Sequence, residues 1–436
     1  MYNTHMKQVI ESSYPITFRE KEASELGSQL KQHHSVVLVG MKRVGISNFL
    51  RFFLNHNDIV TTYIKNGMDQ IFIQVDLNDL IERNIFAFWT LLLTRVVDSV
   101  QGSTLPETIK RQCRKMFVQS IQLKDQFFTV DSLRKCLQTL SEAGYYPTLF
   151  LIRFDRLQDV ATPEFLSNLL GLRDAVKQKL SYVFTSYRPL HELSPDVFKK
   201  QFLTLFSRDM YLPPMNRQDM LTIMDTLEAQ YHTKVSSEIK KTLIDISGGY
   251  VQYLQIALIR IQEDTNIPTT MKGLLSFLSK DEQIIFQSEE MFESLTKSEK
   301  ELLLAIKQGN TVSKEEKENT MYLWNTGIVK DEGIKTVLFS PLFDDYVSTL
   351  TMHTNNGSEE FTKKEHLLFT FLKANINTLC ERESIIDAVW PENREMGVSD
   401  WAIDRLIARL RSKLKDQDSP YQIQTIVTRG YKMVEK

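Results

Sequence analysis

A short apolar segment, followed by a glycine-containing loop and a helical pattern, constrains the fold of this chain more than any other feature. Residues 35–40, Ser-Val-Val-Leu-Val-Gly, have the continuous apolar character of a strand buried on both faces, and residues 46–54 have helical spacing. The alternation continues with apolar runs at 71–75, 147–155 and 180–186 and helical stretches near 84–101, 106–122 and 131–143. Strands that alternate with helices predict a parallel sheet with helices on both faces.

Length and composition indicate a folded protein of several domains. A chain of 436 residues suggests about three domains, and 42% hydrophobic with 25% charged residues is typical of globular chains. Sixteen glycines and twelve prolines are few for a turn-rich all-β protein, so the composition favours helices. Because the net charge is only −2, any surface for nucleic acid must be local.

The cysteines and the apolar runs narrow the cellular setting. Cys113, Cys136 and Cys380 lie far apart in the sequence, which argues against a disulfide framework and a cysteine zinc site and fits a reducing compartment. No apolar run approaches the roughly 18 residues of a membrane span, and the start of the chain lacks the basic-then-apolar pattern of a signal peptide. We therefore expect a cytoplasmic protein with no membrane partner.

The loop after the first strand has the context of a phosphate-binding loop. Gly40-Met-Lys-Arg-Val-Gly-Ile-Ser47 keeps the glycine spacing of GxxxxGK[ST], with Ser47 in the magnesium-binding hydroxyl position. Ile46 occupies the lysine position, and Lys42 and Arg43 are the cations that could replace it. The predicted nucleotide-binding residues are Gly40, Lys42, Arg43, Gly45, Ser47, Asn48 and Arg188.

Polar residues at the ends of the third and fourth strands predict the rest of this site. The third strand leads to Asp155, which we expect to hold magnesium together with Ser47. The next residue is Arg156, at a place where an acid usually polarises the attacking water, and an arginine cannot accept a proton. We therefore expect ATP or ADP with magnesium to bind, little hydrolysis, and no catalytic residue.

The first 352 residues resemble the signal-transducing NTPases of the AAA+/STAND type from about residue 15 onward. The matching segments are Arg19-Glu20 with Glu22 and Leu26, Gly45-Ile-Ser-Asn-Phe-Leu-Arg51, Phe184-Thr-Ser-Tyr-Arg188, Ser247-Gly-Gly-Tyr-Val-Gln-Tyr-Leu254, Leu323-Trp-Asn-Thr-Gly-Ile-Val329 and Phe339-Ser-Pro-Leu-Phe-Asp-Asp-Tyr346. Val251 stands where that family has a nucleotide-contacting proline. The resemblance implies a P-loop NTPase-like α/β domain at 15–212, a helical lid at 213–285 and a winged-helix-like domain at 286–352.

The last segment, after a polar linker at 352–360, has the pattern of a winged helix-turn-helix. Helices are expected after Phe361, where Thr362 and Glu365 form a capping-box pattern, at 381–390, and at 400–415 behind a Ser399 cap. The third helix has an apolar stripe at Ile403, Leu406, Ile407, Leu410 and Leu414, and a local charge of +3 through residue 415. Alternating residues at 422–434 predict a closing β-hairpin.

Residues 361–436 resemble the OmpR/PhoB-type DNA-binding domain. The matches are Phe361-Thr-Lys-Lys-Glu365, Arg382-Glu383, Trp390, Ser399-Asp400, Ile403-Asp404, Ile407, Arg409-Leu410-Arg411, Lys413-Leu414, Thr425-Ile426 and Gly430-Tyr431. The resemblance implies contacts to double-stranded DNA from Trp401, Arg405, Arg409, Ser412 and the wing residue Arg429. Val427-Thr428 replaces the family's Arg-Gly pair in the wing, and no receiver domain precedes this segment.

The whole sequence thus predicts a multidomain α/β plus α protein: a P-loop NTPase-like parallel sheet, a helical lid, a winged helix and a C-terminal winged helix-turn-helix. The leading hypothesis is a transcriptional regulator controlled by a nucleotide-binding, poorly hydrolysing module that self-associates as a homo-oligomer. One alternative is a nucleotide-independent scaffold whose DNA binding is driven by a protein or small-ligand signal. The other is an active ATPase effector tethered to DNA.

Overall fold

The computed structural model separates the chain into two compact units, Met1–Thr351 and Met352–Lys436, which we describe one at a time. It describes residues 9–64, 69–199, 207–264, 267–333, 335–354, 361, 363–390, 400–426 and 429–436. The expected caps Thr362 and Ser399, most of the expected linker, and Val427-Thr428 lie outside the described residues. Within the described part, no helix combines the length and apolar character needed to cross a membrane.

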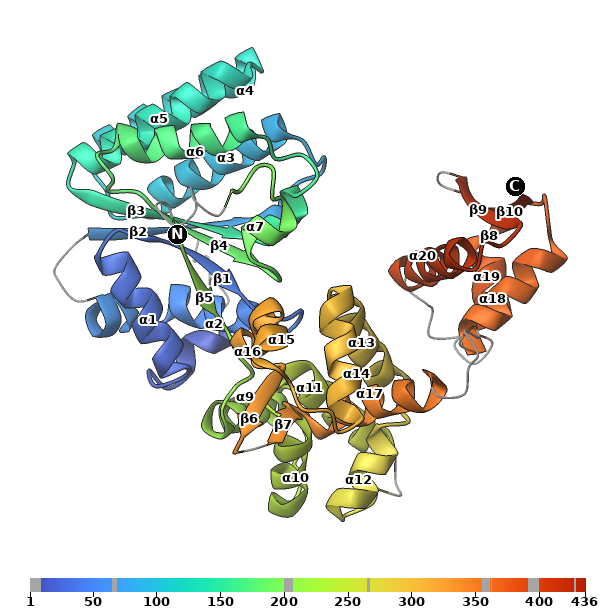
Figure 1. The fold of residues 1–436 in the computed structure, drawn as a ribbon. Helices are drawn as coiled ribbons and strands as arrows, with labels where there is room; N and C mark the ends of the chain where they lie inside the picture. The colour runs from blue at the N-terminus through green and yellow to red at the C-terminus, as the bar shows by residue number, and fades with distance from the viewer. Residues whose placement is uncertain are drawn as a thin grey trace. The chain divides into compact units, whose positions relative to one another are not determined.

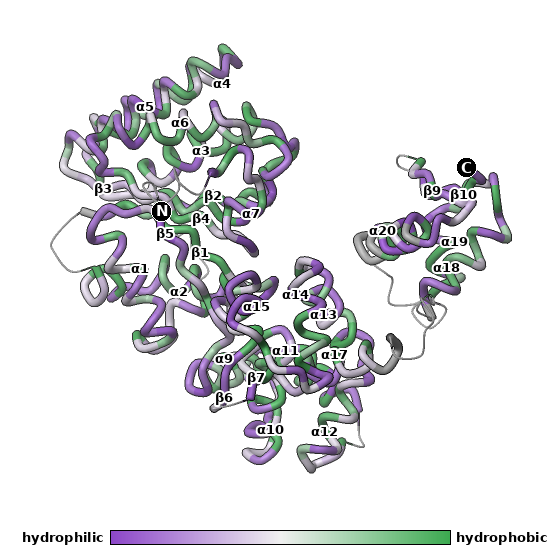
Figure 2. The backbone as a smooth tube through the Cα atoms, viewed as in Figure 1, coloured by the Kyte–Doolittle hydropathy of each residue, from purple (hydrophilic) through white to green (hydrophobic). Residues whose placement is uncertain are grey.

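A five-stranded parallel sheet with the order β2-β3-β4-β1-β5 forms the centre of the first unit (Figure 1). Its strands are β1 (Ser35–Val39), β2 (Asp69–Asp76), β3 (Tyr145–Ile152), β4 (Ser181–Ser186) and β5 (Ser207–Tyr211). Every residue of β1 and β4 is buried, as a central strand covered on both faces requires, and β1 is drawn in the hydrophobic colour in Figure 2.

Helices cover both faces of this sheet. On one face lie α1 (Glu20–Lys31) and α2 (Ile46–Asn55), and on the other lie α3 (Ile85–Gly102), α4 (Glu107–Leu123), α5 (Gln126–Glu142) and α6 (Pro163–Ala175) (Figure 1). Short helices η1 (Ile10–Ser13), η2 (Val60–Ile64), η3 (Leu77–Asp79), η4 (Phe154–Leu157) and α7 (Leu190–Leu193) connect these elements. The predicted P-loop NTPase-like α/β architecture is confirmed.

The rest of the first unit is mainly helical. It comprises α9 (Arg217–Gln230), α10 (Ser237–Ser247), α11 (Val251–Glu263), α12 (Met271–Leu278), α13 (Glu282–Glu293), α14 (Lys297–Lys307), α15 (Lys314–Asn319), α16 (Met321–Asn325) and α17 (Pro341–Thr354), with a β6 (Val329–Glu332) and β7 (Lys335–Leu338) hairpin. Its buried residues belong to the same core as the sheet. Helices and hairpin are therefore continuous with the α/β part.

The second unit has its own core. Its elements are α18 (Lys363–Ala374), β8 (Cys380–Glu381), α19 (Arg382–Val389), α20 (Asp400–Asp416), β9 (Tyr421–Ile426) and β10 (Gly430–Glu435). The predicted apolar stripe of the third helix is buried at all five positions, from Ile403 to Leu414. Strands β9 and β10 form the predicted hairpin, and β8 pairs with β10 on its other edge. This is a winged helix.

Three strands differ from the sequence prediction. The third strand ends at Ile152 rather than at residue 155, because the backbone of Arg153 turns to a positive φ of 60° and a 3₁₀ helix begins. Strand β5 was not predicted; it is an edge strand, and its exposed Arg208 and Asp209 interrupt the apolar pattern. The two-residue β8 is too short to leave a periodic pattern in the sequence.

Candidate functional site

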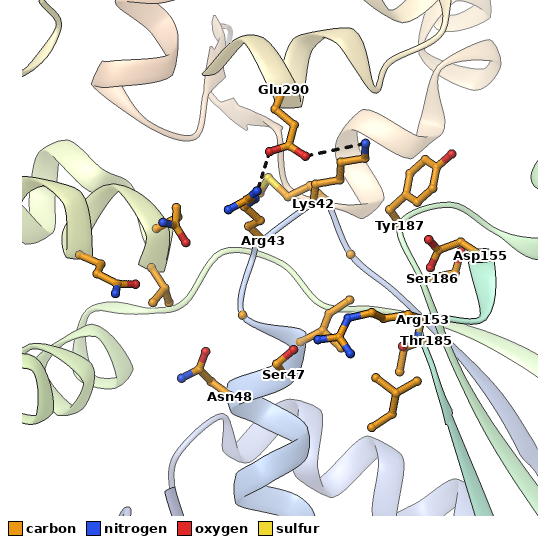
Figure 3. Close-up of a pocket in the computed structure, with 18 residues that line it drawn as sticks. Lys42, Arg43, Ser47, Asn48, Arg153, Asp155, Thr185, Ser186, Tyr187 and Glu290 are labelled. Carbon is orange, nitrogen blue, oxygen red and sulfur yellow. Dashed lines mark hydrogen bonds and ion pairs between the residues drawn. The ribbon is translucent and has the colours of Figure 1, made fainter. Parts of the chain in front are cut away.

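A cavity of about 600 Å³ lies at the carboxyl edge of the parallel sheet, where ligands bind in open α/β folds. It is lined by Gly40, Met41, Lys42, Arg43, Gly45, Ile46, Ser47, Asn48, Ile152, Arg153, Asp155, Thr185, Ser186, Tyr187, Val251, Gln252, Gln255 and Glu290. Figure 3 shows the cavity between the loop before α2, the ends of β3 and β4, and helices of the mainly helical part. The structure therefore brings together six of the seven predicted nucleotide-binding residues.

The loop itself keeps the backbone geometry of an anion-binding turn. Gly45 precedes α2 with a φ of 104°, a conformation that costs other residues about 1–2 kcal/mol. At Gly40 an added Cβ would lie 2.8 Å from Val44 Cγ1, so the close packing of the loop requires glycine there. The first turn of α2 contains Ser47, and the free backbone N–H groups of a helix start favour an anion.

Two buried contacts hold the loop from outside. The Arg19 guanidinium donates to Pro213 O at 2.9 Å and to Val44 O at 3.4 Å, and Tyr250 Oη donates to Lys42 O at 2.8 Å. Burial lowers the pKa of Arg19 to about 10, so it remains protonated at neutral pH. Sequence analysis quoted both residues only as parts of motifs. Arg19 lies 25 residues from the loop residue that it contacts and Tyr250 lies 208 residues away, so these roles depend on the tertiary structure.

Both cations of the loop face one carboxylate, that of Glu290 on α13. Arg43 Nε lies 3.0 Å from Glu290 Oε2, and Lys42 Nζ lies 4.0 Å from Glu290 Oε1 (Figure 3). The Glu290 side chain is 9% exposed, whereas Lys42 and Arg43 keep 32% and 43% of their surface. Sequence analysis missed Glu290, because nothing in the local pattern of α13 distinguishes it from the neighbouring glutamates. In this conformation the Glu290 carboxylate neutralises part of the positive charge with which Lys42 and Arg43 could bind a phosphate.

The side chain at the end of β3 is Arg153, which sequence analysis did not select. Its backbone N–H donates to Thr185 Oγ1 at 2.7 Å, and its guanidinium pairs with Asp76 at the end of β2. Two neighbouring strands thus fix Arg153 at the cavity wall. Because the strand ends earlier than predicted, an arginine follows it directly, and the predicted magnesium ligand Asp155 sits within η4.

Asp155 lines the cavity, but its surroundings are poor for a metal. Burial raises the pKa of its carboxyl, against the opposing effects of Lys42, Arg153 and Arg156. Ser47 supplies a hydroxyl, yet a divalent cation beside it would share the cavity with three cationic side chains and only one carboxylate besides Asp155, that of Glu290. The residues present fit an anion better than they fit magnesium.

Two arginines of the expected site lie elsewhere. Arg156 donates to Asn78 Oδ1 at 2.7 Å and does not line the cavity. Arg188 is also absent from the lining; its guanidinium pairs with Glu299 of α14 and lies 3.8 Å from the centre of the Tyr322 ring. In this structure Arg188 connects the end of β4 to the helices that follow, and it does not reach the cavity.

In the second unit, several basic residues of α20 contact the domain itself. Lys413 Nζ lies 2.7 Å from the buried Glu365 of α18, and Arg409 Nε lies 3.7 Å from the same carboxylate. Burial lowers the pKa of Arg409 to about 10. Arg411 donates to Ile423 O at 2.9 Å and to Thr425 Oγ1 at 2.8 Å, which fastens the helix to β9.

The other predicted DNA contacts differ in how far the structure describes them. Ser412 and Arg429 are exposed. Trp401 and Arg405 belong to α20, but their side chains lie outside the described residues. Positions 401, 405, 408 and 412 follow one face of the helix, and both Ala408 and Ser412 on that face are exposed. Exposed positions on a helix beside a hairpin wing, such as these two, are typical of proteins that read the major groove.

The C-terminal residues match a known family. Residues 356–433 match the family described as "Transcriptional regulatory protein, C terminal". The response regulator ArlR of Staphylococcus aureus strain Mu50 is 39% identical over 79 residues, as is ArlR of strain MW2. The alignment covers 18% of this chain and 35% of each relative, so the chain spans about a third of the length of the curated relatives it matches.

Solved structures resemble the larger part of the chain at low identity. The Walker-type ATPase PABY2304 of Pyrococcus abyssi is 15% identical, with 76% of this chain and 95% of that chain covered and a TM-score of 0.47. The ORC2 protein of Aeropyrum pernix in its ADP form is 12% identical, with coverages of 78% and 95% and a TM-score of 0.43. The sheet order of the first unit and the family match of residues 356–433 confirm the predicted combination of a P-loop NTPase-like α/β fold with an OmpR/PhoB-type C-terminal domain.

Proposed function

We propose that this chain is a transcriptional regulator that binds double-stranded DNA through its second unit and binds ATP or ADP, with little hydrolysis, in the cavity of its first unit. The DNA-binding part of the proposal is supported by the winged helix, in which Ala408 and Ser412 of α20 and the wing residue Arg429 are exposed, in a segment that matches the transcriptional-regulator family. Sequence-specific reading would come from that helix face and phosphate contacts from its surroundings.

Duplex binding by the full chain tests this proposal. Affinity for DNA should fall steeply with salt, because each phosphate contact releases counterions. Arg429→Ala should lower the slope of log affinity against log salt by about one, and should weaken all sequences similarly. Lys436→Ala, at the exposed chain end beside Asp418, is the matched control. The DNA-binding proposal is wrong if the chain shows no salt-dependent binding to genomic duplex fragments.

Glu290 supports a role for the cavity as a switch. Phosphate oxygens and the Glu290 carboxylate would compete for Lys42 and Arg43, so ligand entry would loosen the contact between the loop and α13. A ligand shifts a conformational equilibrium only through such differential contacts. The neutral variant Glu290→Gln should tighten binding of ADP by roughly 10-fold, because it removes from the cavity a negative charge that repels the phosphates and competes for Lys42 and Arg43.

The scaffold alternative predicts that the same residues exclude nucleotide from the cavity. In that case Ile46 and the ion pairs of Glu290 keep nucleotide out altogether, and a protein or small-ligand signal drives DNA binding. Titration calorimetry of the full chain, Glu290→Gln and the control Glu293→Gln separates the two. Glu293, on the same helix as Glu290, pairs with Lys300 of α14 and does not line the cavity. Absence of ATP and ADP binding in all three proteins would favour the scaffold.

A further inference from the structure

The charged side chains that line the cavity indicate whether a phosphate ligand would bind with or without magnesium. Three cationic side chains, Lys42, Arg43 and Arg153, line the cavity together with two acids, Asp155 and Glu290. The two loop cations are shared with Glu290, at 4.0 and 3.0 Å. Arg153 faces the cavity from the opposite wall, the end of β3, and in Figure 3 its side chain extends in the direction of Ser47 at the start of α2.

The position of Arg153 is built into the sheet. Its φ of 60° ends β3, the Thr185 hydroxyl of β4 accepts its backbone N–H, and Asp76 of β2 pairs with its guanidinium. The side chain nevertheless keeps 39% of its surface, so a ligand can reach it. A guanidinium held by a fixed carboxylate loses little rotamer freedom on binding, and its planar fork suits phosphate oxygens.

A divalent cation and Arg153 would serve the same purpose at this wall. Magnesium neutralises phosphate charge and is usually held by a hydroxyl, one or two carboxylates and the phosphates themselves. Here Ser47 offers the hydroxyl, but the residue at the end of β3 is the cation Arg153, and the carboxyl of Asp155 follows within η4. A divalent cation and the Arg153 guanidinium in one partly desolvated cavity would repel each other.

We propose that the cavity takes the phosphates of its ligand as a metal-free anion, with the Arg153 guanidinium supplying the charge that magnesium would supply. This inference rests on the proposed nucleotide site and specifies the ligand form. The shared chemistry is a chain of phosphates, which a nucleotide or inorganic pyrophosphate could provide.

Titration calorimetry of the full chain tests the inference, with ADP, ATP and pyrophosphate, each in EDTA and in excess magnesium. ADP or ATP should bind in EDTA, and magnesium should weaken the affinity by about 10-fold, the value of one lost charge-assisted contact. Binding only with magnesium would overturn the metal-free inference and leave the nucleotide site standing. Absence of binding under both conditions would overturn the inference and the nucleotide part of the proposed function together.

Variants of this wall separate a binding role from a structural one. Arg153→Met should lower the affinity in EDTA by about 10-fold and remove the effect of magnesium. Arg156→Met is the matched control, because Arg156 lies three residues on, contacts Asn78 and does not line the cavity. An unchanged affinity and magnesium effect in a folded Arg153→Met protein would overturn the inference.

A second variant keeps the arginine and changes its partner. Asp76→Asn removes the negative charge beside the Arg153 guanidinium but keeps an amide oxygen that can accept from it and hold it in place, so binding in EDTA should tighten. Weaker or unchanged binding would contradict a direct contact between Arg153 and the ligand. The pyrophosphate titration identifies the source of the phosphates: affinity equal to that of ADP assigns binding to phosphate alone, and loss of affinity assigns it to a nucleotide.

Discussion

Single residues decide how this P-loop-like site differs from a working ATPase site. The loop retains its glycines and Ser47, but Ile46 lies where a lysine would contact the phosphates. The cations that line the cavity instead, Lys42, Arg43 and Arg153, each have a carboxylate partner. The site therefore has charge for an anion, yet each contact competes with an existing ion pair.

Restoring the lysine should strengthen nucleotide binding. A charge-assisted contact contributes about 1.5–3 kcal/mol, so Ile46→Lys should tighten ATP binding by about 10- to 100-fold in a calorimetric titration. Ile46→Met, which keeps the length without the charge, is the control. If the two variants bind ATP equally, the Ile46 side chain does not point at the phosphates.

The buried carboxyl of Asp155 predicts a pH dependence. Because burial raises its pKa, the folded state binds the proton more tightly than the unfolded chain does. The resulting stabilisation is present below the unfolded pKa, about 4, and is lost as the pH rises through the folded pKa. Asp155→Asn should therefore raise Tm at pH 7, and the gain should shrink as the pH falls towards 4. Asp98→Asn, at an exposed position, should show neither effect. If the Tm gain of Asp155→Asn does not depend on pH, the raised pKa of Asp155 is not its cause.

At the scale of elements, ion pairs and caps join the sheet to the helices behind it. Arg188, directly after β4, pairs with Glu299 in the first turn of α14, and Glu299 also closes the capping box of that helix with Thr296. Both side chains of the pair are 5% exposed. A buried charge without its partner costs about 3–5 kcal/mol.

Removing one partner of this pair should therefore destabilise the first unit strongly. Glu299→Ala should lower the free energy of unfolding by about 3–5 kcal/mol in denaturant titrations. The exposed Glu301→Ala, two residues on and paired with Lys297 at 3.9 Å, should change it by less than about 0.5 kcal/mol. In a double-mutant cycle, Arg188→Met should recover part of the loss. Additive single effects would mean that the pair is not coupled.

At the scale of the molecule, two units with separate cores share one chain. The first contains the cavity and the second the winged helix, so regulation requires that nucleotide and DNA change each other's affinity. Such coupling is reciprocal and typically amounts to about 5- to 150-fold.

Nucleotide should thus shift DNA affinity of the full chain, and DNA should shift nucleotide affinity by the same factor. Fluorescence anisotropy with a labelled duplex, with and without ADP, measures the first, and calorimetry with and without the duplex measures the second. The fragment 352–436 has its own core and should bind DNA without any response to ADP. Equal DNA affinities of the full chain with and without bound ADP would exclude control by nucleotide.

The sequence alone determined most of the elements and their order. Continuous apolar runs predicted four of the five strands, because parallel strands covered on both faces leave no polar alternation, and the stripe from Ile403 to Leu414 predicted the core of the winged helix. Glycine spacing located the loop, since its backbone geometry requires residues without a Cβ. Each of these features depends on residues that are close together in the sequence, so the sequence pattern alone predicts it.

Only the tertiary structure decided which charges meet. It placed Glu290 against Lys42 and Arg43, moved Arg188 to Glu299, and set Arg153 rather than Asp155 at the end of β3. These pairings join segments between about 80 and 250 residues apart, so no spacing in the sequence encodes them. Ion pairs depend on distance in space and on burial, both of which are set by packing of the whole core.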